Sequence, residues 1–311
     1  MRLLQIWIFT GGLVLLLNQC SPTAKQAAPV KKGTLIHLDQ VSSTYVDPRP
    51  IDVWLPPGYD STRRYPVLYM HDGQMLFDGQ RTWNHQEWKV DETMDSLVIS
   101  KQVRPAIIVA IPNNGPYRWA EYVPQVILDS LPVSIKEEVI RKWLNNRPSA
   151  DAYLKYIALE LKPHIDHHFS TLSDRDHTYI MGSSMGGIIS LYAICSYPDV
   201  FGGAACMSSH WPLDIPGTTE DDIAYDVPGF YIRYVANHLP APDGHRIYFD
   251  YGTETLDSLY EPYQMRVDRL MTWRGYGDAN WITRKFPGAS HSEDSWAERL
   301  PIPLIFLLGQ P

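Results

Sequence analysis

Cysteine is scarce in this chain of 311 residues, which contains only three. Cys20 follows an apolar N-terminal segment, and Cys195 and Cys206 lie much further along. Two cysteines cannot form the dense disulfide framework that holds small secreted domains together. Because one lies in an expected helix and the other in an expected strand, the pattern favours two buried free thiols.

Blocks of like charge are also missing, although the net charge is -8. A nucleic-acid-binding surface needs clustered Lys and Arg, so the sequence offers no basis for a nucleic-acid partner and favours neutral or weakly charged substrates. No composition break, internal repeat or low-complexity segment divides the chain. With 44% hydrophobic residues, its length suits one domain with a sizeable core.

The apolar run from Ile6 to Leu17 is too short for a membrane span, which needs about 20 apolar residues. It follows Arg2 and has the length of a signal-peptide core. Cys20 comes where a bacterial lipoprotein would be cleaved and lipidated. We therefore expect a signal peptide at 1–19, a lipidated Cys20, a flexible tether over 20–33 and a folded domain over 34–311.

This interpretation predicts an exported lipoprotein that contacts the membrane through its lipid anchor only. Ordinary secretion with an idle Cys20 and an uncleaved anchor remain open as alternatives. The anchor would hold the domain on the periplasmic side of a membrane or at the cell surface.

Strand-like apolar runs recur through the domain and alternate with helical patterns. The runs cover Thr34–Leu38, Ile51–Leu55, Pro66–His71, Ala106–Ile111, Thr178–Met181, Phe201–Met207, Ile247–Tyr251 and Trp281–Phe286. Apolar spacings of three and four predict helices over Asp151–Phe169 and around Tyr263–Met271. Such alternation is typical of an α/β fold with a mostly parallel central sheet flanked by helices.

Two longer stretches, Pro112–Ala150 and Ser208–Gly244, show no clean periodicity and are rich in proline and aromatic residues. In open α/β sheets, ligands bind at the carboxyl ends of the strands. We expect these two stretches to be insertions that shape or cover a site at that edge.

Residues 178–187 read Thr-Tyr-Ile-Met-Gly-Ser-Ser-Met-Gly-Gly, an apolar run that ends in a Gly-x-Ser-x-Gly turn. A buried strand, this turn and a following helix form the nucleophile elbow of the α/β-hydrolase fold, with Ser184 at its tip. Positions two before and two after the serine crowd each other in so tight a turn. Gly182 and Gly186 are therefore both expected to require the absence of a side chain.

A serine hydroxyl needs a general base, usually a histidine that is oriented by a carboxylate. In this fold the acid and then the histidine follow the serine along the chain. The histidines after Ser184 are His210, His238, His245 and His291. His291 fits best, because a short turn carries it past the end of the last predicted strand. His245 precedes a strand, and His210 lies upstream of any suitable acid.

The acid is expected in the loop after Ile247–Tyr251, which carries Glu254 and Asp257. Proline is tolerated in the first turn of a helix, so the next helix should start near Pro262. Asp257 then lies inside the loop and is not needed as a helix cap. Asp257 is the predicted acid and Glu254 the alternative.

Acyl transfer also requires hydrogen-bond donors for the developing oxyanion. One is the backbone amide of Met185, directly after the nucleophile. The second should follow the third strand, where Gln74 N–H is the candidate and Gly73 N–H is close behind, although Asp72-Gly73 could be a plain turn. The same strand end places His71 and Asp72 beside the expected substrate.

With these residues in place, the chain from about Ile51 to Leu308 resembles the putative-esterase family, which contains esterase D, feruloyl and acetylxylan esterases, enterochelin esterases and mycobacterial mycolyltransferases. The resemblance rests on Leu55–Tyr59, Tyr65–Gln74, the elbow, Gly252–Glu254 and Gly288–His291. It implies a single α/β-hydrolase domain. Family members often place the acid directly after a Gly-Thr-x start, whereas Thr255 stands there in this chain and Asp257 comes later.

The resemblance further implies that Arg118 and Glu121 lie near the pocket. Their alternative interpretation is an ion-paired support for the loop.

Aromatic residues are abundant, with 10 tryptophans and 19 tyrosines. Candidates for sugar-stacking platforms in or near the expected loops are Trp83, Trp88, Trp119, Trp211 and Tyr231, of which Trp211 is taken as the substrate-binding candidate. Aromatic side chains more often fill cores. Trp296, five residues after His291, is expected to pack behind the active loop.

A metal centre is the main competing interpretation, because His164, His167 and His168 lie close together in an expected helix. Pro163 interrupts that helix, adjacent histidines point to different faces, and no glutamate completes a metalloprotease pattern. We interpret the three histidines as structural or solvated and expect no metal site.

The sequence thus predicts a serine esterase with Ser184 as nucleophile, His291 as base and acid, Asp257 as its orienting carboxylate, and no cofactor. Its partner would be a small-molecule or oligosaccharide ester, with acetyl, feruloyl or similar acyl groups on a polar scaffold. Two alternatives remain: an acyltransferase of the mycolyltransferase type with the same triad, and a non-catalytic carbohydrate-binding lipoprotein.

Overall fold

The computed structural model describes residues 32–212 and 227–309. The expected signal peptide, Cys20 and most of the expected tether lie outside the described residues. Within the described ranges, no helix is long and apolar enough to cross a membrane. Gly33, at the end of the expected tether, donates its backbone N–H to Asp95 Oδ1 at 2.8 Å, and the first strand starts at the next residue.

Eight strands form one sheet in the described part of the chain, in the order β1-β2-β4-β3-β5-β6-β7-β8. Their bounds are β1 Thr34–Val41, β2 Arg49–Leu55, β3 Val67–His71, β4 Ile107–Ile111, β5 Thr178–Ser183, β6 Gly203–Met207, β7 Arg246–Gly252 and β8 Trp281–Phe286. β2 pairs antiparallel with β1 and β4, whereas the pairs from β4 through β8 are all parallel. All eight predicted strands are confirmed.

The central strands β3, β4, β5 and β6 are buried along their whole length. Parallel strands with helices on both faces have no solvated side, so their sequences read as continuous apolar runs. The edge strand β1 instead keeps most of its side chains exposed or half-buried. The central strands therefore have a clearer apolar signal in the sequence than the edge strand.

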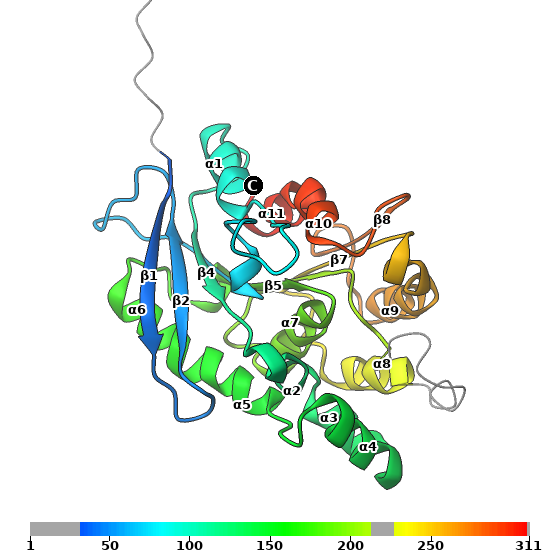
Figure 1. Ribbon diagram of the computed structural model, residues 1–311. Coiled ribbons are helices and arrows are strands. Elements are labelled where there is room, and N and C mark those ends of the chain that lie inside the picture. The colour runs from blue at the N-terminus through cyan, green and yellow to red at the C-terminus, as the bar shows by residue number, and fades with distance from the viewer. Residues whose placement is uncertain (1–31, 213–226, 310–311) are drawn as a thin grey trace, which may run out of the picture. The chain divides into compact units, whose positions relative to one another are not determined.

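Helices cover both faces of the sheet (Figure 1). α1 (Val90–Ile99), α10 (Glu293–Arg299) and α11 (Pro301–Leu308) pack on one face, in a core that includes Leu68, Met181 and Leu304. The larger core, on the other face, is covered by α5 (Ala150–Lys155), α6 (Lys162–His168), α7 (Met185–Ser196), α8 (Val227–His238) and α9 (Glu261–Trp273).

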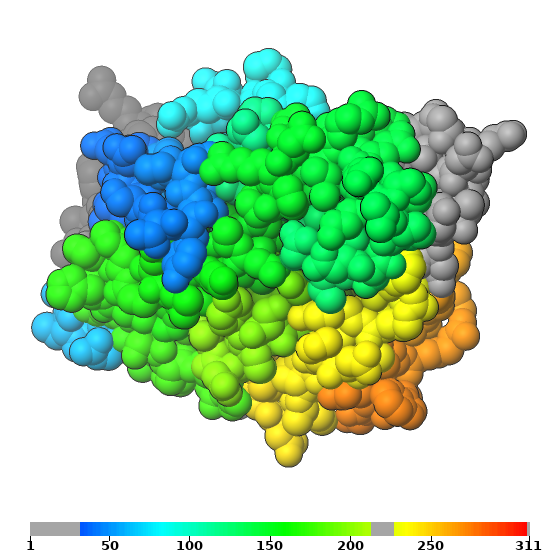
Figure 2. Space-filling view, turned by 90° about the horizontal axis from the view of Figure 1, so that it is seen from below, coloured from blue at the N-terminus to red at the C-terminus, as the bar shows by residue number. Residues whose placement is uncertain are grey.

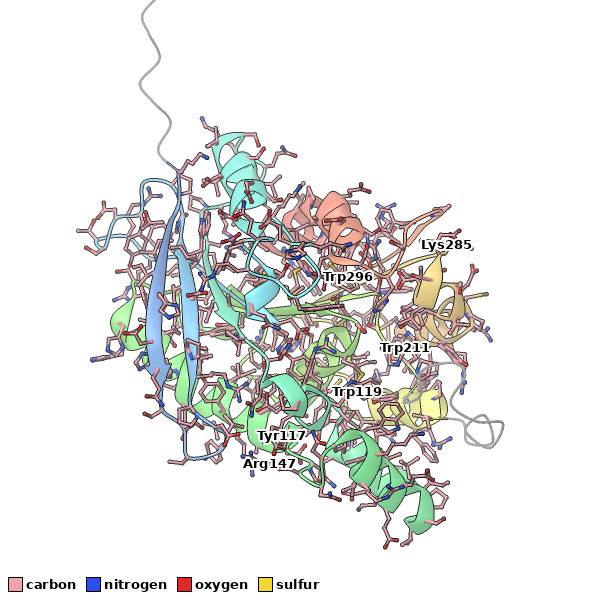
Figure 3. The ribbon with its side chains drawn as sticks, in the orientation of Figure 1. Tyr117, Trp119, Arg147, Trp211, Lys285 and Trp296 are labelled. Atoms are coloured by element: carbon pink, nitrogen blue, oxygen red, sulfur yellow. The ribbon has the colours of Figure 1, made fainter. Side chains whose placement is uncertain are left out.

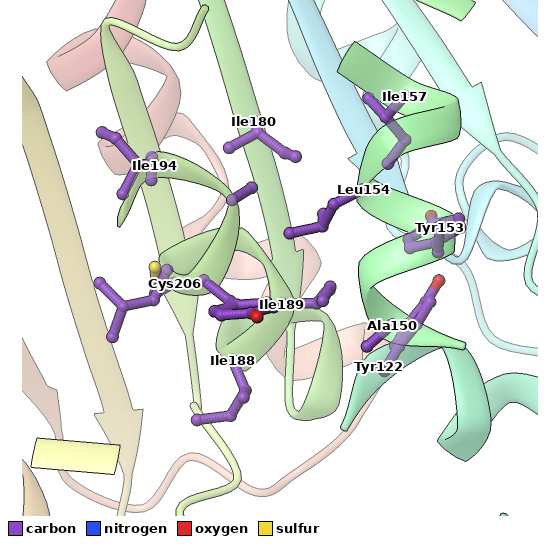
Figure 4. Close-up of a cluster of buried hydrophobic side chains, with 14 of the residues drawn as sticks. Tyr122, Ala150, Tyr153, Leu154, Ile157, Ile180, Ile188, Ile189, Ile194 and Cys206 are labelled. Carbon is purple, nitrogen blue, oxygen red and sulfur yellow. The ribbon is translucent and has the colours of Figure 1, made fainter. Parts of the chain in front are cut away.

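The larger core is filled where the helix that starts at α5 packs against α7 and β5. Tyr153, Leu154 and Ile157 lie on the α5 side, facing Ile180 and Ile189 across the cluster (Figure 4). Burial of each such side chain contributes about 1.5–3 kcal/mol relative to its exposed state. This packing fixes α7, and with it the turn that precedes α7.

The predicted helix over Asp151–Phe169 is present as three consecutive segments. α5 continues into a π-helical segment, η3 (Tyr156–Leu161), and then into α6. The α-helical hydrogen-bond ladder is therefore interrupted just before Pro163, which sits in the first turn of α6, where a missing N–H costs little. The predicted helix start near Pro262 is also confirmed, because α9 begins at Glu261.

The first insertion contains helices that the sequence pattern did not reveal. These are η2 (Gly115–Tyr117), α2 (Arg118–Tyr122), α3 (Gln125–Ser130) and α4 (Val133–Trp143). The second insertion carries α8 after its undescribed part. Seen from below, residues of the first insertion, α5 and α8 form a continuous surface (Figure 2). Cys195 and Cys206 are buried and unbridged, as predicted.

Candidate active site

The tight turn between β5 and α7 holds Ser184 in a strained conformation, with φ 57° and ψ -123°. A non-glycine residue in such a region costs about 1–3 kcal/mol and persists only where the surroundings enforce it. The backbone N–H of Ser184 donates to the carbonyl of Met207 at 2.9 Å. The sharp turn thus leaves the serine at the carboxyl end of the sheet, at the start of a helix.

The two glycines of the turn differ in how strictly they are needed. A Cβ on Gly182 would lie 2.8 Å from the backbone carbon of Gly186, so the predicted crowding is confirmed at this position. A Cβ on Gly186 would meet only Asp72 Oδ2 and His71 Cβ, both at 3.5 Å, which is ordinary contact. The expectation that Gly186 must lack a side chain is therefore not supported by crowding.

The loops that carry Asp257 and His291 are hydrogen-bonded to each other. The N–H groups of Thr253 and Glu254 donate to the carbonyl of Ala289 at 3.0 Å. The Oγ1 of Thr255 accepts the His291 backbone N–H at 2.8 Å. These bonds fix the histidine relative to the loop after β7.

Gly252, at the start of this junction, allows the two loops to approach so closely. A Cβ there would lie 2.1 Å from the carbonyl oxygen of Ala289 and 2.9 Å from Asp257 Oδ2. The glycine of the Gly-Thr pattern is therefore required by close backbone contact.

His291 Nδ1 lies 2.6 Å from Asp257 Oδ1. With its Nδ1–H donated to the carboxylate, a neutral His291 has its lone pair on Nε2, which is the arrangement a general base needs. Glu254, the alternative acid, is exposed. The structure brings Asp257, and not Glu254, to His291.

Asp257 is completely buried but well supplied with donors. Besides His291, its Oδ2 accepts from Ser208 Oγ at 2.6 Å and from the Gly252 backbone N–H at 2.5 Å. Burial alone raises the pKa of this carboxyl, but His291, Ser208 and the Gly252 amide outweigh it, so the pKa of Asp257 lies below its ordinary value. Asp257 is ionised at neutral pH.

Trp296 packs behind the histidine, as predicted. Its ring meets the His291 imidazole edge-on, with centroids 5.0 Å apart. Its indole Nε1 donates to Ser208 Oγ at 3.0 Å. α10 thereby provides a second contact to the histidine ring, besides the one from Asp257.

The loop after β3 adjoins the elbow and carries the expected oxyanion donor Gln74. It forms a short 3-10 turn, η1 (Gly73–Met75), in which the first N–H groups have no partner within the turn. A Cβ on Gly73 would lie 2.6 Å from the β4 backbone, so only glycine permits this packing. The Gln74 side chain accepts the Asn113 backbone N–H at 3.1 Å.

Asp72 and Arg118 form a paired support under this loop. Arg118 Nε and Nη2 donate to the two Asp72 carboxylate oxygens, both at 2.7 Å, and Asn113 Nδ2 adds a third donor at 2.7 Å. Burial raises the pKa of Asp72, but the Arg118 charge and hydrogen bonds outweigh it and the pKa lies below its ordinary value. This ion pair holds the loop that carries Gln74.

A cleft of about 670 Å³ opens over these residues. Its lining includes Ser184, His291, Gln74, Asp72 and Arg118. Polar and aromatic side chains complete the wall, namely Trp83, Asn84, Gln86, Trp88, Asn113, Glu293 and Trp296. The nucleophile, base and oxyanion-loop candidates therefore share one solvent-accessible site.

Three predicted substrate-binding residues do not line this cleft. His71 and Glu121 are each 2% exposed, and Trp211 is fully buried. Glu121 forms a buried ion pair with Arg49, as the alternative interpretation had it. Trp211, which is labelled in Figure 3, instead packs against the rings of Tyr231 and Phe249, with centroids 6.4 Å apart in each pair. The expectation that these three side chains contact substrate is corrected.

Sequence reasoning missed several buried polar residues behind the triad candidates, chiefly Ser208, Asp250 and Arg299. Arg299 pairs with Asp250 at 3.2 Å and donates to Ser208 Oγ at 2.7 Å. His210 is also buried nearby, with its Nδ1 2.6 Å from the Tyr260 hydroxyl. Only the position of Ser208 directly after a predicted strand could have drawn attention to this group.

In the described parts of the chain, no cluster of three or more His, Cys, Asp or Glu side chains is arranged to hold a metal ion. His164 and His168 instead stack, with ring centroids 4.2 Å apart. The cleft brings together a serine at the elbow and a histidine that is hydrogen-bonded to a buried carboxylate.

A family model described as "Putative esterase" matches residues 42–306. Among curated proteins, the uncharacterized protein YbbA of Bacillus subtilis is 25% identical over 166 residues, which cover 52% of this chain and 58% of YbbA. The endo-1,4-beta-xylanase/feruloyl esterase of Xylanibacter ruminicola is 28% identical over 172 residues, which cover 54% of this chain and 19% of that protein. The matches thus span less than two thirds of either relative.

Solved structures of esterases share the fold. A ferulic acid esterase aligns with a TM-score of 0.63 and 21% identity over 90% of this chain and 98% of its own. The feruloyl esterase module from Clostridium thermocellum has a TM-score of 0.62 and 15% identity, covering 88% of each chain. The enterobactin esterase from Shigella flexneri has a TM-score of 0.56 and 18% identity, covering 91% of this chain and 60% of its own. The predicted α/β-hydrolase fold is confirmed.

Proposed function

Because this chain belongs to the Putative esterase family, we propose that it hydrolyses carboxylic esters through a covalent acyl-enzyme on Ser184. The observation that carries the proposal is the His291 to Asp257 hydrogen bond of 2.6 Å, in a cleft that also contains Ser184. A nucleophile elbow is suited to acyl transfer when a histidine with an ionised, buried carboxylate partner lies in the same cleft.

In the first half-reaction, Ser184 Oγ attacks the ester carbonyl carbon while His291 Nε2 takes its proton. The resulting oxyanion is stabilised by the backbone N–H groups of Met185 and Gln74, each contributing about 2.7–4 kcal/mol to the transition state. His291 then returns the proton to the leaving alcohol. Asp257 stays ionised throughout and stabilises the imidazolium.

In the second half-reaction, His291 takes a proton from water, whose oxygen attacks the acyl-enzyme. The tetrahedral intermediate collapses, Ser184 regains its proton from His291, and the carboxylic acid leaves. No step requires a group beyond the protein and water. The proposed acyl groups are acetyl, feruloyl or similar, carried on a carbohydrate or another polar scaffold.

Support for this substrate class comes from the cleft and from the relatives. The lining mixes amide side chains with tryptophans, and two of the similar solved structures are named as ferulic acid or feruloyl esterases. The test is steady-state hydrolysis of acetyl and feruloyl esters with and without an added sugar alcohol. Release of free acid with little acyl transfer is expected; transfer that outcompetes hydrolysis at modest acceptor concentration would favour the acyltransferase.

Export and lipidation remain part of the proposal. The apolar run before Cys20 supports an anchor that leaves the folded domain tethered beside the membrane. A Cys20→Ser variant should appear in the soluble fraction of fractionated cells, whereas the unchanged chain should appear with membranes. Equal partition of both would contradict lipid anchoring.

A further inference from the structure

Trp83 is held out of the protein at the mouth of the cleft, where its side chain is 82% exposed. The loop that carries it is internally bonded. Thr82 is buried and donates its hydroxyl to the carbonyl of Gly79 at 2.9 Å, and the Gly79 N–H donates to Glu87 Oε2 at 2.7 Å. The indole is therefore presented to solvent by a defined loop.

Polar side chains line the cleft together with this indole. Gln86 lines this cleft and is half-buried. Glu293 lines the same wall, where its Oε2 accepts from Asn84 Nδ2 at 2.7 Å. An aromatic face next to amide and carboxylate oxygens suits a sugar, which offers an apolar C–H face and several hydroxyl donors.

The Asn84 to Glu293 bond also ties the Trp83 loop to the His291 side of the cleft, because Glu293 follows His291 by two residues. In an acyl transfer, the histidine protonates the leaving alcohol. The group that departs toward His291 is the alcohol part of the ester.

We propose that Trp83, Gln86 and Glu293 form a subsite for the alcohol part of the substrate, and that this alcohol is a carbohydrate. This inference rests on the proposed esterase function for its orientation. The sugar ring stacks on the indole, and its hydroxyls form hydrogen bonds with the Gln86 amide group and the Glu293 carboxylate.

The test compares a feruloylated or acetylated oligosaccharide with the methyl ester of the same acid. Trp83→Ala should raise KM for the oligosaccharide ester roughly tenfold or more and change kcat/KM for the methyl ester less than about twofold. The matched control is Trp273→Ala, because Trp273 is 74% exposed but lies at the end of α9, outside the cleft lining. Equal effects of Trp83→Ala on both esters, or none on either, would overturn the subsite.

Binding is measured separately from catalysis, so that the two proposals fail independently. Calorimetric titration of the unesterified oligosaccharide should give binding to the Ser184→Ala protein and at least about tenfold weaker binding to Ser184→Ala/Trp83→Ala. If the protein hydrolyses no ester but the two variants still differ in oligosaccharide affinity, only the esterase proposal is rejected. If the unchanged protein hydrolyses esters but the two variants bind the oligosaccharide equally well, only the subsite proposal is rejected.

A second inference comes from the buried hydroxyl of Ser208, which is fully inaccessible to solvent. Its Oγ lies 2.7 Å from Arg299 Nη2, 3.0 Å from Trp296 Nε1 and 2.6 Å from Asp257 Oδ2. Guanidinium and indole nitrogens donate hydrogen bonds and never accept them. Both lone pairs of the hydroxyl are thereby occupied, and its only hydrogen is directed to Asp257.

We infer that Ser208 is a positioning residue for the triad acid. Together with the Gly252 N–H it holds Oδ2, which leaves Oδ1 free to face His291. Arg299 is itself oriented by Asp250, at 3.2 Å. The arrangement sets both the direction of the carboxylate and how tightly it holds a proton.

Ser208→Ala should lower kcat roughly tenfold to a hundredfold while KM changes less than about threefold. A carboxylate that loses a hydrogen-bond donor holds a proton more tightly and attracts the positive charge of a neighbouring imidazolium more strongly. The acid limb of the kcat/KM profile should therefore move to higher pH.

The matched control is Ser190→Ala, which removes another fully buried hydroxyl, one that donates to the Gly186 carbonyl at 2.7 Å. It should leave the acid limb in place. Trp296→Phe keeps an aromatic ring against His291 but removes one hydrogen-bond donor to Ser208. It should therefore move the acid limb of the kcat/KM profile to higher pH by less than Ser208→Ala does. This variant also provides a measurement if Ser208→Ala does not fold. An unmoved acid limb in both variants would overturn the inference.

Discussion

Asp257 Oδ1 and His291 Nδ1 are 2.6 Å apart, although 34 residues and a complete helix and strand separate them along the chain. The contact exists because the loops after β7 and β8 are hydrogen-bonded through Thr253, Thr255 and Ala289. The pair lies at the carboxyl end of the parallel strands, beside the elbow. It is the relationship on which the proposed chemistry depends.

The first prediction concerns the identity of the acid. Asp257→Asn should reduce kcat by about 10³-fold or more, because an amide cannot stabilise the imidazolium and favours the wrong tautomer. Glu254→Gln, at an exposed position, should change kcat less than about twofold. Both variants are assayed on the same acetyl ester, and the reverse ranking would reassign the acid to Glu254.

The second prediction concerns the glycine that lets the two loops meet. Gly252→Ala would place a Cβ 2.1 Å from the Ala289 carbonyl and should destabilise the fold by about 1–3 kcal/mol while moving Asp257 away from His291. Gly277→Ala is the control, since a Cβ there meets nothing within 4 Å. Urea unfolding and ester hydrolysis are measured for both; similar behaviour of the two variants would refute the role of close packing.

The third prediction concerns the ion pair under the oxyanion loop. Arg118→Lys keeps the charge but loses the bidentate contact with Asp72, so kcat/KM should fall roughly tenfold as Gln74 loses its fixed position. Arg147→Lys changes a comparable pair with Asp47 on the surface, where little effect is expected. If Arg118→Lys retains wild-type kcat/KM, the loop does not depend on this contact.

The fourth prediction concerns stability at mildly acidic pH. Burial lowers the pKa of His71 and of His210 from 6.5 to about 3. Between about pH 3 and pH 6.5, these two histidines bind protons in the unfolded chain but not in the folded chain. The free energy of unfolding therefore falls as the pH drops below about 6.5, by about 1.4 kcal/mol per pH unit for each histidine. Depressed carboxyl groups such as Asp257 add to this only below about pH 4.

Urea unfolding at pH 7.5 and 5.5 measures this slope. His71→Gln and His210→Gln should each reduce it, whereas His238→Gln, at an exposed position, should not. A slope that is the same in all four proteins would show that the two buried histidines are not the source.

Much of this architecture was predictable because local sequence carries it. The central strands are buried on both faces and appear as uninterrupted apolar runs, and the elbow requires Gly182 and Ser184 at fixed spacing. The order of serine, acid and histidine then selected His291 and Asp257 from many candidates. The short helices α2 and α3, of five and six residues, are too brief to show a helical period.

The site predictions were wrong or incomplete for side chains whose partners lie far away in the sequence. Glu121 looked like a cleft residue, but it is paired with Arg49, 72 residues earlier. Ser208, Asp250 and Arg299 lie on three segments that meet only in the folded sheet, so no local pattern connects them. Tertiary proximity decides whether such groups are buried supports or substrate contacts.

The central claim is that Ser184 is the nucleophile, and labelling by a fluorophosphonate probe tests it most directly. The unchanged protein should take up one probe per chain, on the peptide that contains Ser184, with ester hydrolysis lost in parallel. The Ser184→Ala variant should bind no probe while keeping the same unfolding midpoint in urea. Labelling that persists in a folded Ser184→Ala protein would contradict the account.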